Sequence, residues 1–191
     1  MYAIEVFRDF DADSEIIVVL PEHQIDFWKA LCKRHSFDIK HQIVCGGKTR
    51  FHSVQNGLSK INDNGIVFIH DGVRPLVSPE TLKRCADIAG KTGNAIPVLP
   101  INESLRKVDG QSNISVDRNQ YFAVQTPQTF RSEQILKAFQ QEYDPLFTDD
   151  ASVAEKAGFE IHLVEGNREN IKITTPVDLI VAEAILSKSA S

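Results

Sequence analysis

Three short segments contain residue types that could do chemistry, and each lies beyond the end of an expected strand. In the first of them, Gly46 and Gly47 would let the backbone approach a ligand closely. The helix expected after Ser53 would offer free N–H groups to an anion. A phosphate loop of the G-x-x-x-x-G-K-T type would need glycine where Gln42 stands, so an ordinary glycine turn explains this segment equally well.

The second segment is His70-Asp71-Gly72-Val73-Arg74-Pro75. Asp71 and Arg74 could hold Mg²⁺ and a phosphate oxygen respectively, because Mg²⁺ takes one or two carboxylates together with substrate phosphates. They could equally form a surface turn in which the two charges pair. In the third segment Lys172 is flanked by apolar residues, and its ammonium could point inward at an anion or outward on the polar face of a strand.

Short apolar runs alternate with amphipathic segments along most of the chain. The expected strands are 16–20, 39–44, 66–69, 95–99 and 160–164. The expected helices are 1–10, 24–35, 53–61, 79–89, 133–143, 150–157 and a last one from Pro176, with Thr175 as its cap. This rhythm predicts an α/β fold with a mainly parallel sheet covered by helices on both faces.

Residues 104–125 break this rhythm by alternating polar and apolar side chains. Asp109-Gly110 is a hairpin turn signal within this stretch. The pattern predicts a protruding β-ribbon, although an edge excursion folded back on the body would give the same alternation.

Composition narrows the class of protein. The 191 residues, of which 42% are hydrophobic, predict one domain spanning 1–191. A net charge of −5 offers no general attraction to nucleic acid or to an anionic membrane, and no apolar run approaches the roughly 20 residues of a membrane span. The odd number of cysteines (Cys32, Cys45 and Cys85), without C-x-x-C spacing, predicts free thiols in the cytoplasm.

Seven blocks together resemble the 2-C-methyl-D-erythritol 4-phosphate cytidylyltransferase family in order and spacing, over essentially the whole chain. These blocks are Gly46-Gly47 with Ser53, His70-Asp71-Gly72-Val73-Arg74-Pro75, Val116-Asp117-Arg118, Gln125-Thr126-Pro127-Gln128, Thr148-Asp149-Asp150-Ala151-Ser152, Val164-Glu165-Gly166 and Asn170-Ile171-Lys172. Agreement in seven ordered blocks is far more specific than any one motif.

The resemblance implies a Rossmann-like nucleotide-diphospho-sugar transferase fold and Mg²⁺-dependent transfer of CMP from CTP to methylerythritol phosphate. It implies a homodimer that exchanges the ribbon, an arm over about 104–125, so that Arg118 and Thr126 reach the neighbour's site. The implied nucleotide contacts are Gly46, Gly47, Ser53 and Asp71, with Asp71 also the metal ligand. The implied acceptor contacts are Arg74, Ser104, Arg118, Thr126, Thr148 and Lys172, and the implied catalytic residues are Asp71, Arg118 and Lys172.

Charge neutralisation agrees with these implied roles. An acceptor phosphate attacking an α-phosphate brings two anions together, and cations must neutralise and align them. Mg²⁺ on Asp71 would withdraw charge from the α-phosphate while Arg118 and Lys172 hold the attacking phosphate. A phosphate monoester is already nucleophilic, so His70 is not required as a base.

The chain departs from the family pattern in three places. Ser104 stands where the family usually has Thr, and Lys48 stands where it often has an acidic residue. The family's opening strand and glycine-rich loop, with its Arg and a following Lys, do not precede Met1, so we expect the 191-residue chain as written to be inactive or severely impaired. Two other functions fit the same blocks, ribitol-5-phosphate cytidylyltransferase and a non-catalytic nucleotide-binding dimer.

Overall fold

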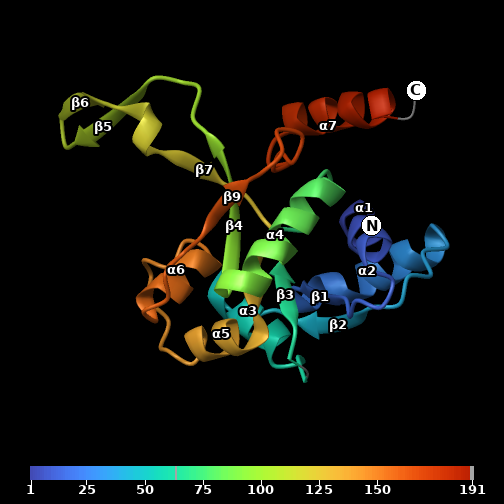
Figure 1. Ribbon diagram of the computed structural model, residues 1–191. Coiled ribbons are helices and arrows are strands. Elements are labelled where there is room, and N and C mark those ends of the chain that lie inside the picture. The colour runs from blue at the N-terminus through green and yellow to red at the C-terminus, as the bar shows by residue number, and fades with distance from the viewer. Residues whose placement is uncertain (63, 190–191) are drawn as a thin grey trace.

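A mixed β-sheet with helices on both faces forms the body of the chain, and two elements project from it (Figure 1). The computed structural model describes residues 1–62 and 64–189. The helices are α1 (Tyr2–Phe10), α2 (Glu22–Arg34), α3 (Arg50–Leu58), α4 (Pro79–Thr92), the 3-10 helix η1 (Arg118–Gln120), α5 (Ser132–Ala138), α6 (Asp150–Lys156) and α7 (Pro176–Ser189). The strands are β1 (Ile17–Leu20), β2 (Gln42–Cys45), β3 (Ile66–Ile69), β4 (Asn94–Pro100), β5 (Leu105–Asp109), β6 (Ser112–Val116), β7 (Phe122–Val124), β8 (Gln128–Arg131) and β9 (Leu163–Glu165).

Local sequence sets where several helices begin and end. Ser78 caps α4 by accepting a hydrogen bond from the Thr81 N–H at 3.2 Å, and Asp149 caps α6 by accepting from the Ser152 N–H at 2.9 Å. Helix α4 ends at Gly93, whose φ of 101° lies in the left-handed region that glycine adopts without a steric penalty. Both helix starts agree with the sequence pattern.

The strand directions correct the expectation of a mainly parallel sheet. Strands β1 and β2 pair in parallel as a two-stranded sheet, whereas the larger sheet runs β3-β8-β4-β7 with antiparallel pairs, and β9 joins β4 in parallel. The chain path after β4 explains the difference. It passes through the β5–β6 hairpin, returns as β7 antiparallel to β4, and continues as β8 between β3 and β4. Strand β8 was not among the strands expected from sequence.

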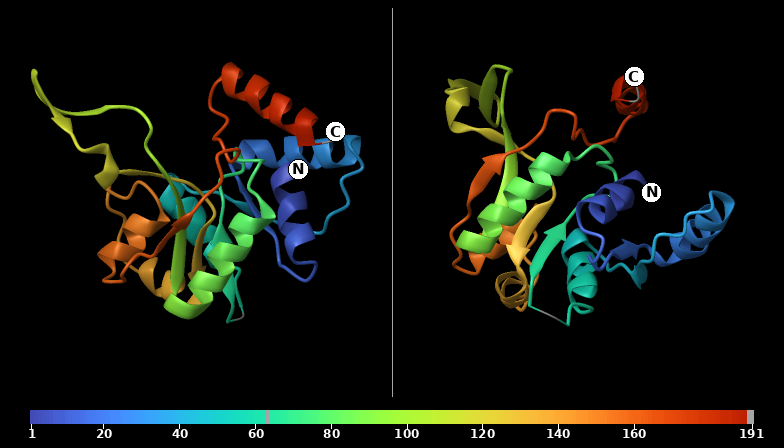
Figure 2. Two further views of the ribbon diagram at one scale, coloured as in Figure 1. Left: turned by 45° about the horizontal axis from the view of Figure 1, so that its top comes forward. Right: turned by 45° about the vertical axis from the view of Figure 1, so that its right-hand side comes forward.

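Apolar side chains pack on both faces of the larger sheet and hold the strand ends in place. The main cluster joins Phe130 of β8 with Phe51 of α3, Ile135 of α5 and Val153 of α6. A smaller cluster joins α4 to β4 through buried Cys85, Ala89 and Ala95. The two views of Figure 2 show α4 on one face and α3 with α5 on the other. The loops that follow the strands therefore start from a fixed frame.

The β5–β6 hairpin and α7 extend away from the body (Figures 1 and 2). The hairpin protrudes as the sequence pattern predicts and is not folded back on the sheet. Apolar side chains are exposed on it, with Val108 70% and Ile114 63% exposed. Helix α7 also exposes Val177 and Ile180. No helix within the described ranges is long and apolar enough to cross a bilayer.

Candidate active site

Asp71 lies two residues after the end of β3, at the centre of three cationic side chains. Lys172 Nζ is 3.2 Å from Asp71 Oδ2, and Arg74 Nε is 3.5 Å from the same oxygen. Arg50 Nε lies 3.8 Å from Asp71 Oδ1. The Asp71 side chain is 15% exposed whereas that of Lys172 is 47% exposed, so a ligand from solvent can reach the ammonium.

The charges around Asp71 favour an anionic ligand. Burial acts to raise the pKa of the Asp71 carboxyl, but the Lys172 hydrogen bond and the charges of Arg50 and Arg74 lower it below its ordinary value. Asp71 is therefore a carboxylate at neutral pH. Arg50 is already paired with a second carboxylate, that of Asp150. The two remaining cations, Arg74 and Lys172, therefore face only one negative charge, that of Asp71. This excess of positive charge suits a phosphate.

Arg50 joins Asp71 to a second, fully buried carboxylate. Arg50 Nη1 and Nη2 donate to the two oxygens of Asp150 at 2.7 and 2.6 Å, and the Asp150 side chain is 0% exposed. Burial acts to raise the pKa of Asp150, and the guanidinium opposes that rise. The sequence motifs assign a role to neither Arg50 nor Asp150. The available signal is that Arg50 begins α3, where a positive charge is unfavourable unless it has a partner.

The glycine turn between β2 and α3 is attached to this centre through Arg50. The Gly47 N–H donates to Ser53 Oγ at 3.0 Å, so the predicted nucleotide contacts Gly46, Gly47 and Ser53 lie together. A Cβ on Gly47 would lie 2.4 Å from the Cβ of His52, and only glycine fits there.

Three segments far apart in sequence are hydrogen bonded around Asp71. The Asp71 N–H donates to Thr126 Oγ1 at 3.0 Å, and Asn170 Nδ2 donates to the Thr126 carbonyl at 2.7 Å. Arg74 Nη1 donates to the Asn170 carbonyl at 2.8 Å. Thr126 is 5% exposed and bonded to Asp71 within its own chain, and its predicted contact with a neighbour's site stays a prediction.

Residues 1–188 match the family described as 2-C-methyl-D-erythritol 4-phosphate cytidylyltransferase. The chain belongs to this family. A relative of that name from Bacteroides fragilis is 53% identical over 186 residues, which cover 97% of this chain and 85% of the relative. One from Bacteroides thetaiotaomicron is 50% identical with the same coverage. The crystal structure of the enzyme from Thermus thermophilus superposes with a TM-score of 0.79 at 30% identity, covering 97% of this chain and 89% of that one.

Three predicted acceptor contacts of this cytidylyltransferase-family chain lie outside the Asp71 cluster. Ser104 is exposed just before β5, and Arg118 is exposed on η1, where it donates to the Asn102 carbonyl. Thr148 is exposed in the loop before α6, next to the cap Asp149. The acceptor roles of Ser104, Arg118 and Thr148 therefore stay predictions.

The predicted metal site consists of one carboxylate, that of Asp71. Among the described residues, no three His, Cys, Asp or Glu side chains are grouped to hold a metal ion. Mg²⁺ commonly binds to one or two protein carboxylates and completes its shell with water and substrate phosphates. Asp71 fits such an ion when it arrives with the phosphates of a nucleotide.

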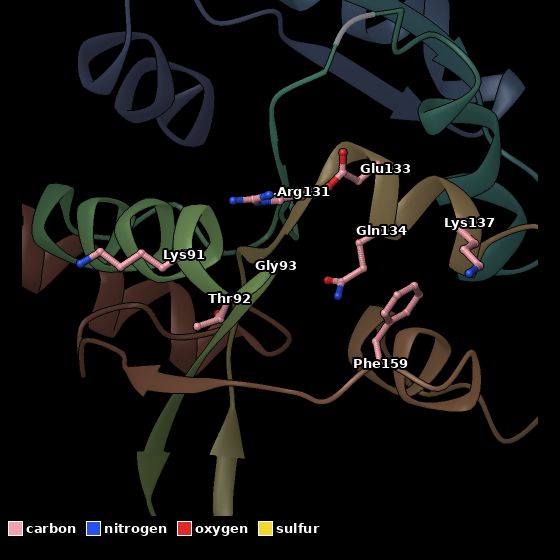
Figure 3. A pocket seen from close by; sticks show the side chains of 8 residues that line it. All are labelled: Lys91, Thr92, Gly93, Arg131, Glu133, Gln134, Lys137 and Phe159. Carbon is pink, nitrogen blue, oxygen red and sulfur yellow. Dashed lines mark ion pairs between the residues drawn. The ribbon is translucent and has the colours of Figure 1, made fainter.

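A separate pocket of about 410 Å³ lies at the opposite end of the sheet (Figure 3). Its lining residues are Lys91, Thr92, Gly93, Arg131, Glu133, Gln134, Lys137 and Phe159. Several of its polar groups bond to other protein groups: Thr92 Oγ1 donates to the Asn94 carbonyl, Asn94 Nδ2 donates to Gln134 Oε1, and Arg131 pairs with Glu133 at 3.7 Å. The pocket is not part of the Asp71 centre.

Proposed function

We propose that the chain transfers the cytidylyl group of CTP to the phosphate of 2-C-methyl-D-erythritol 4-phosphate, with release of pyrophosphate, in non-mevalonate isoprenoid biosynthesis. One observation carries this proposal: in a member of this family, Arg74 and Lys172 converge on Asp71 at the end of a strand. Ligands bind at such strand ends in open α/β sheets.

The side chains around Asp71 have roles that follow from their charges. Mg²⁺ held by Asp71 and the CTP phosphates would withdraw charge from the α-phosphate. Lys172 and Arg74 bind the acceptor phosphate and hold it for attack, with Thr148 and the arm residues Ser104 and Arg118 completing the acceptor site.

His70 plays no part in proton transfer in this scheme. Burial lowers the pKa of His70 to about 4, and both of its ring nitrogens lie within hydrogen-bond distance of protein partners. The acceptor phosphate is already a nucleophile at neutral pH and needs no base. Neutralising two anions is therefore the main task of the site.

The proposal also covers the residues that bind CTP and the association of two chains. Gly46, Gly47 and Ser53 bind the cytosine and ribose, where the tight turn exposes backbone groups. The chain acts in the cytoplasm as a homodimer that exchanges its arm. Exposed Val108 and Ile114 on that arm support association, because apolar side chains in solvent favour burial.

The proposal is tested by ligand binding and by pyrophosphate release. Two forms are compared: residues 1–191, and the same residues preceded by the strand and glycine-rich loop of a relative. We expect heat of binding with CTP and Mg²⁺, and pyrophosphate release by the extended form with methylerythritol phosphate. Faster pyrophosphate release with ribitol 5-phosphate would show that ribitol 5-phosphate, and not methylerythritol phosphate, is the acceptor. Binding without release would favour a non-catalytic dimer, and no binding in either form would reject the proposal.

A further inference from the structure

His70 lies in a chain of hydrogen bonds that connects the two ends of the Asp71–Arg74 turn. Its Nε2 is 2.7 Å from the Arg74 carbonyl oxygen, and its Nδ1 is 3.1 Å from Thr126 Oγ1. Thr126 Oγ1 is in turn 3.0 Å from the Asp71 backbone nitrogen. The Arg74 N–H closes the turn by donating to the Asp71 carbonyl at 2.9 Å.

The chemistry of the end groups fixes the direction of this chain. A carbonyl oxygen only accepts, so His70 Nε2 carries a proton and donates it to Arg74. A backbone N–H only donates, so Thr126 Oγ1 accepts from Asp71. In the neutral ring Nδ1 is then an acceptor, and the Thr126 hydroxyl proton points at it.

An aromatic side chain packs against the ring. The Phe7 ring contacts it edge-on with 5.2 Å between centroids, and His70 is partly buried just after the end of β3. An imidazolium would have two donors, and the Thr126 hydroxyl would need another acceptor for its own proton.

We propose that His70, which donates from Nε2 and accepts at Nδ1, is a positioning residue that fixes the two ends of the turn by separate bonds. Through Nδ1 and Thr126 it fixes the backbone of Asp71, on the metal and nucleotide side. Through Nε2–H it fixes the carbonyl of Arg74, on the acceptor side. The assignment of these sides rests on the proposed function.

In this arrangement Thr126 supports Asp71 and does not contact the acceptor phosphate. Its single hydroxyl proton goes to His70 and one lone pair accepts from Asp71, so it has no proton to donate to an acceptor phosphate. Thr126 therefore serves the site by holding Asp71, and its loss affects the nucleotide side first.

Two amide variants separate the two bonds of the ring. The amide of His70→Gln reaches the place of Nε2 and can still donate to Arg74, but it leaves Thr126 without its acceptor. The shorter amide of His70→Asn reaches the place of Nδ1 and can still accept from Thr126, but it leaves the Arg74 carbonyl without its donor. His23→Gln, on the exposed face of α2, is the matched control.

Calorimetry with Mg²⁺–CTP measures binding at the nucleotide side of the site, and calorimetry with methylerythritol phosphate measures binding at the acceptor side. Loss of one such bond typically costs a factor of about 5 to 10 in an equilibrium constant. We expect His70→Gln to weaken Mg²⁺–CTP binding by about that factor, with acceptor binding changed less than about threefold, and His70→Asn to give the reverse pattern. Equal losses of both ligands in both variants would overturn the proposal and leave His70 a merely structural residue.

A direct measurement does not depend on substrates or on folding of the variants. The imidazole ¹⁵N NMR spectrum of the unmodified protein at neutral pH should show Nε2 protonated and Nδ1 bare. The opposite tautomer or a doubly protonated ring would overturn the proposal. If the unmodified protein binds neither ligand, the proposed function fails while this spectrum still tests the hydrogen-bond chain. Thr126→Val should share the His70→Gln pattern, and Thr126→Ser should recover part of the loss.

Discussion

The Asp71 centre and the projecting arm differ in whether their side chains have partners within the same chain. Around Asp71, the charged side chains find partners within the same chain, with Arg50, Arg74 and Lys172 all within 3.8 Å of the carboxylate. On the arm, Val108 and Ile114 lie in solvent. One region is thus organised by folding of a single chain, whereas the other has apolar surface that association could bury. Substitutions should therefore affect folding and ligand binding at the centre, and assembly on the arm.

The largest effect is expected where a buried charge loses its partner. Arg50→Ala leaves Asp150 buried and unpaired, and this typically destabilises a fold by about 3 to 5 kcal/mol. Urea unfolding followed by circular dichroism measures the change. Lys83→Ala is the matched control, because the Lys83–Asp87 pair is exposed and should contribute less than about 1 kcal/mol. Equal effects of the two variants would show that the buried pair does not organise the centre.

His70 should make stability depend on pH in a defined window. Burial lowers the pKa of His70 from 6.5 to about 4. Between these two pH values the imidazole is protonated in the unfolded chain and neutral in the folded chain. The contribution of neutral His70 is fully present above pH 6.5 and is lost as the pH falls toward 4, by about 3 kcal/mol at most. Unfolding free energies of the unmodified protein and of His70→Gln, compared across this range, isolate the effect. Parallel curves would contradict it.

Lys172 should matter more for the acceptor than for CTP. Lys172→Ala removes an exposed cation from the predicted acceptor side, and we expect kcat/KM for methylerythritol phosphate to fall by about 10²-fold in the extended form. The dissociation constant of CTP should change by less than about threefold. Lys83→Ala again serves as a control for loss of a lysine. An unchanged acceptor response would remove Lys172 from the site.

The smallest effect on a single chain is expected on the arm. Ile114→Ser replaces an exposed apolar side chain, so the unfolding free energy at high dilution should change by less than about 0.5 kcal/mol. Sedimentation velocity over a range of concentrations should nevertheless show weaker self-association. Unaltered association would argue that the arm is not the dimer contact.

The sequence predicted those parts of the fold that depend on neighbouring residues. The run Ile66–Ile69 is a strand with the expected bounds, and α7 begins at Pro176 after the cap candidate Thr175. The hairpin turn at Asp109-Gly110 also lies where the turn signal predicts. Periodicity, caps and turn residues act over a few positions, so they can be read without knowing the tertiary structure.

Sequence by itself also indicated that Asp71, Arg74 and Lys172 follow strands, where ligands bind. Only the tertiary structure decided that Arg50 pairs with Asp150, a hundred positions away, and that Thr126 bonds to His70 and Asp71. It likewise decided the antiparallel direction of β8. These contacts depend on the order of strands in the sheet and on the return path of the chain through the arm, and no local pattern of residue types encodes either.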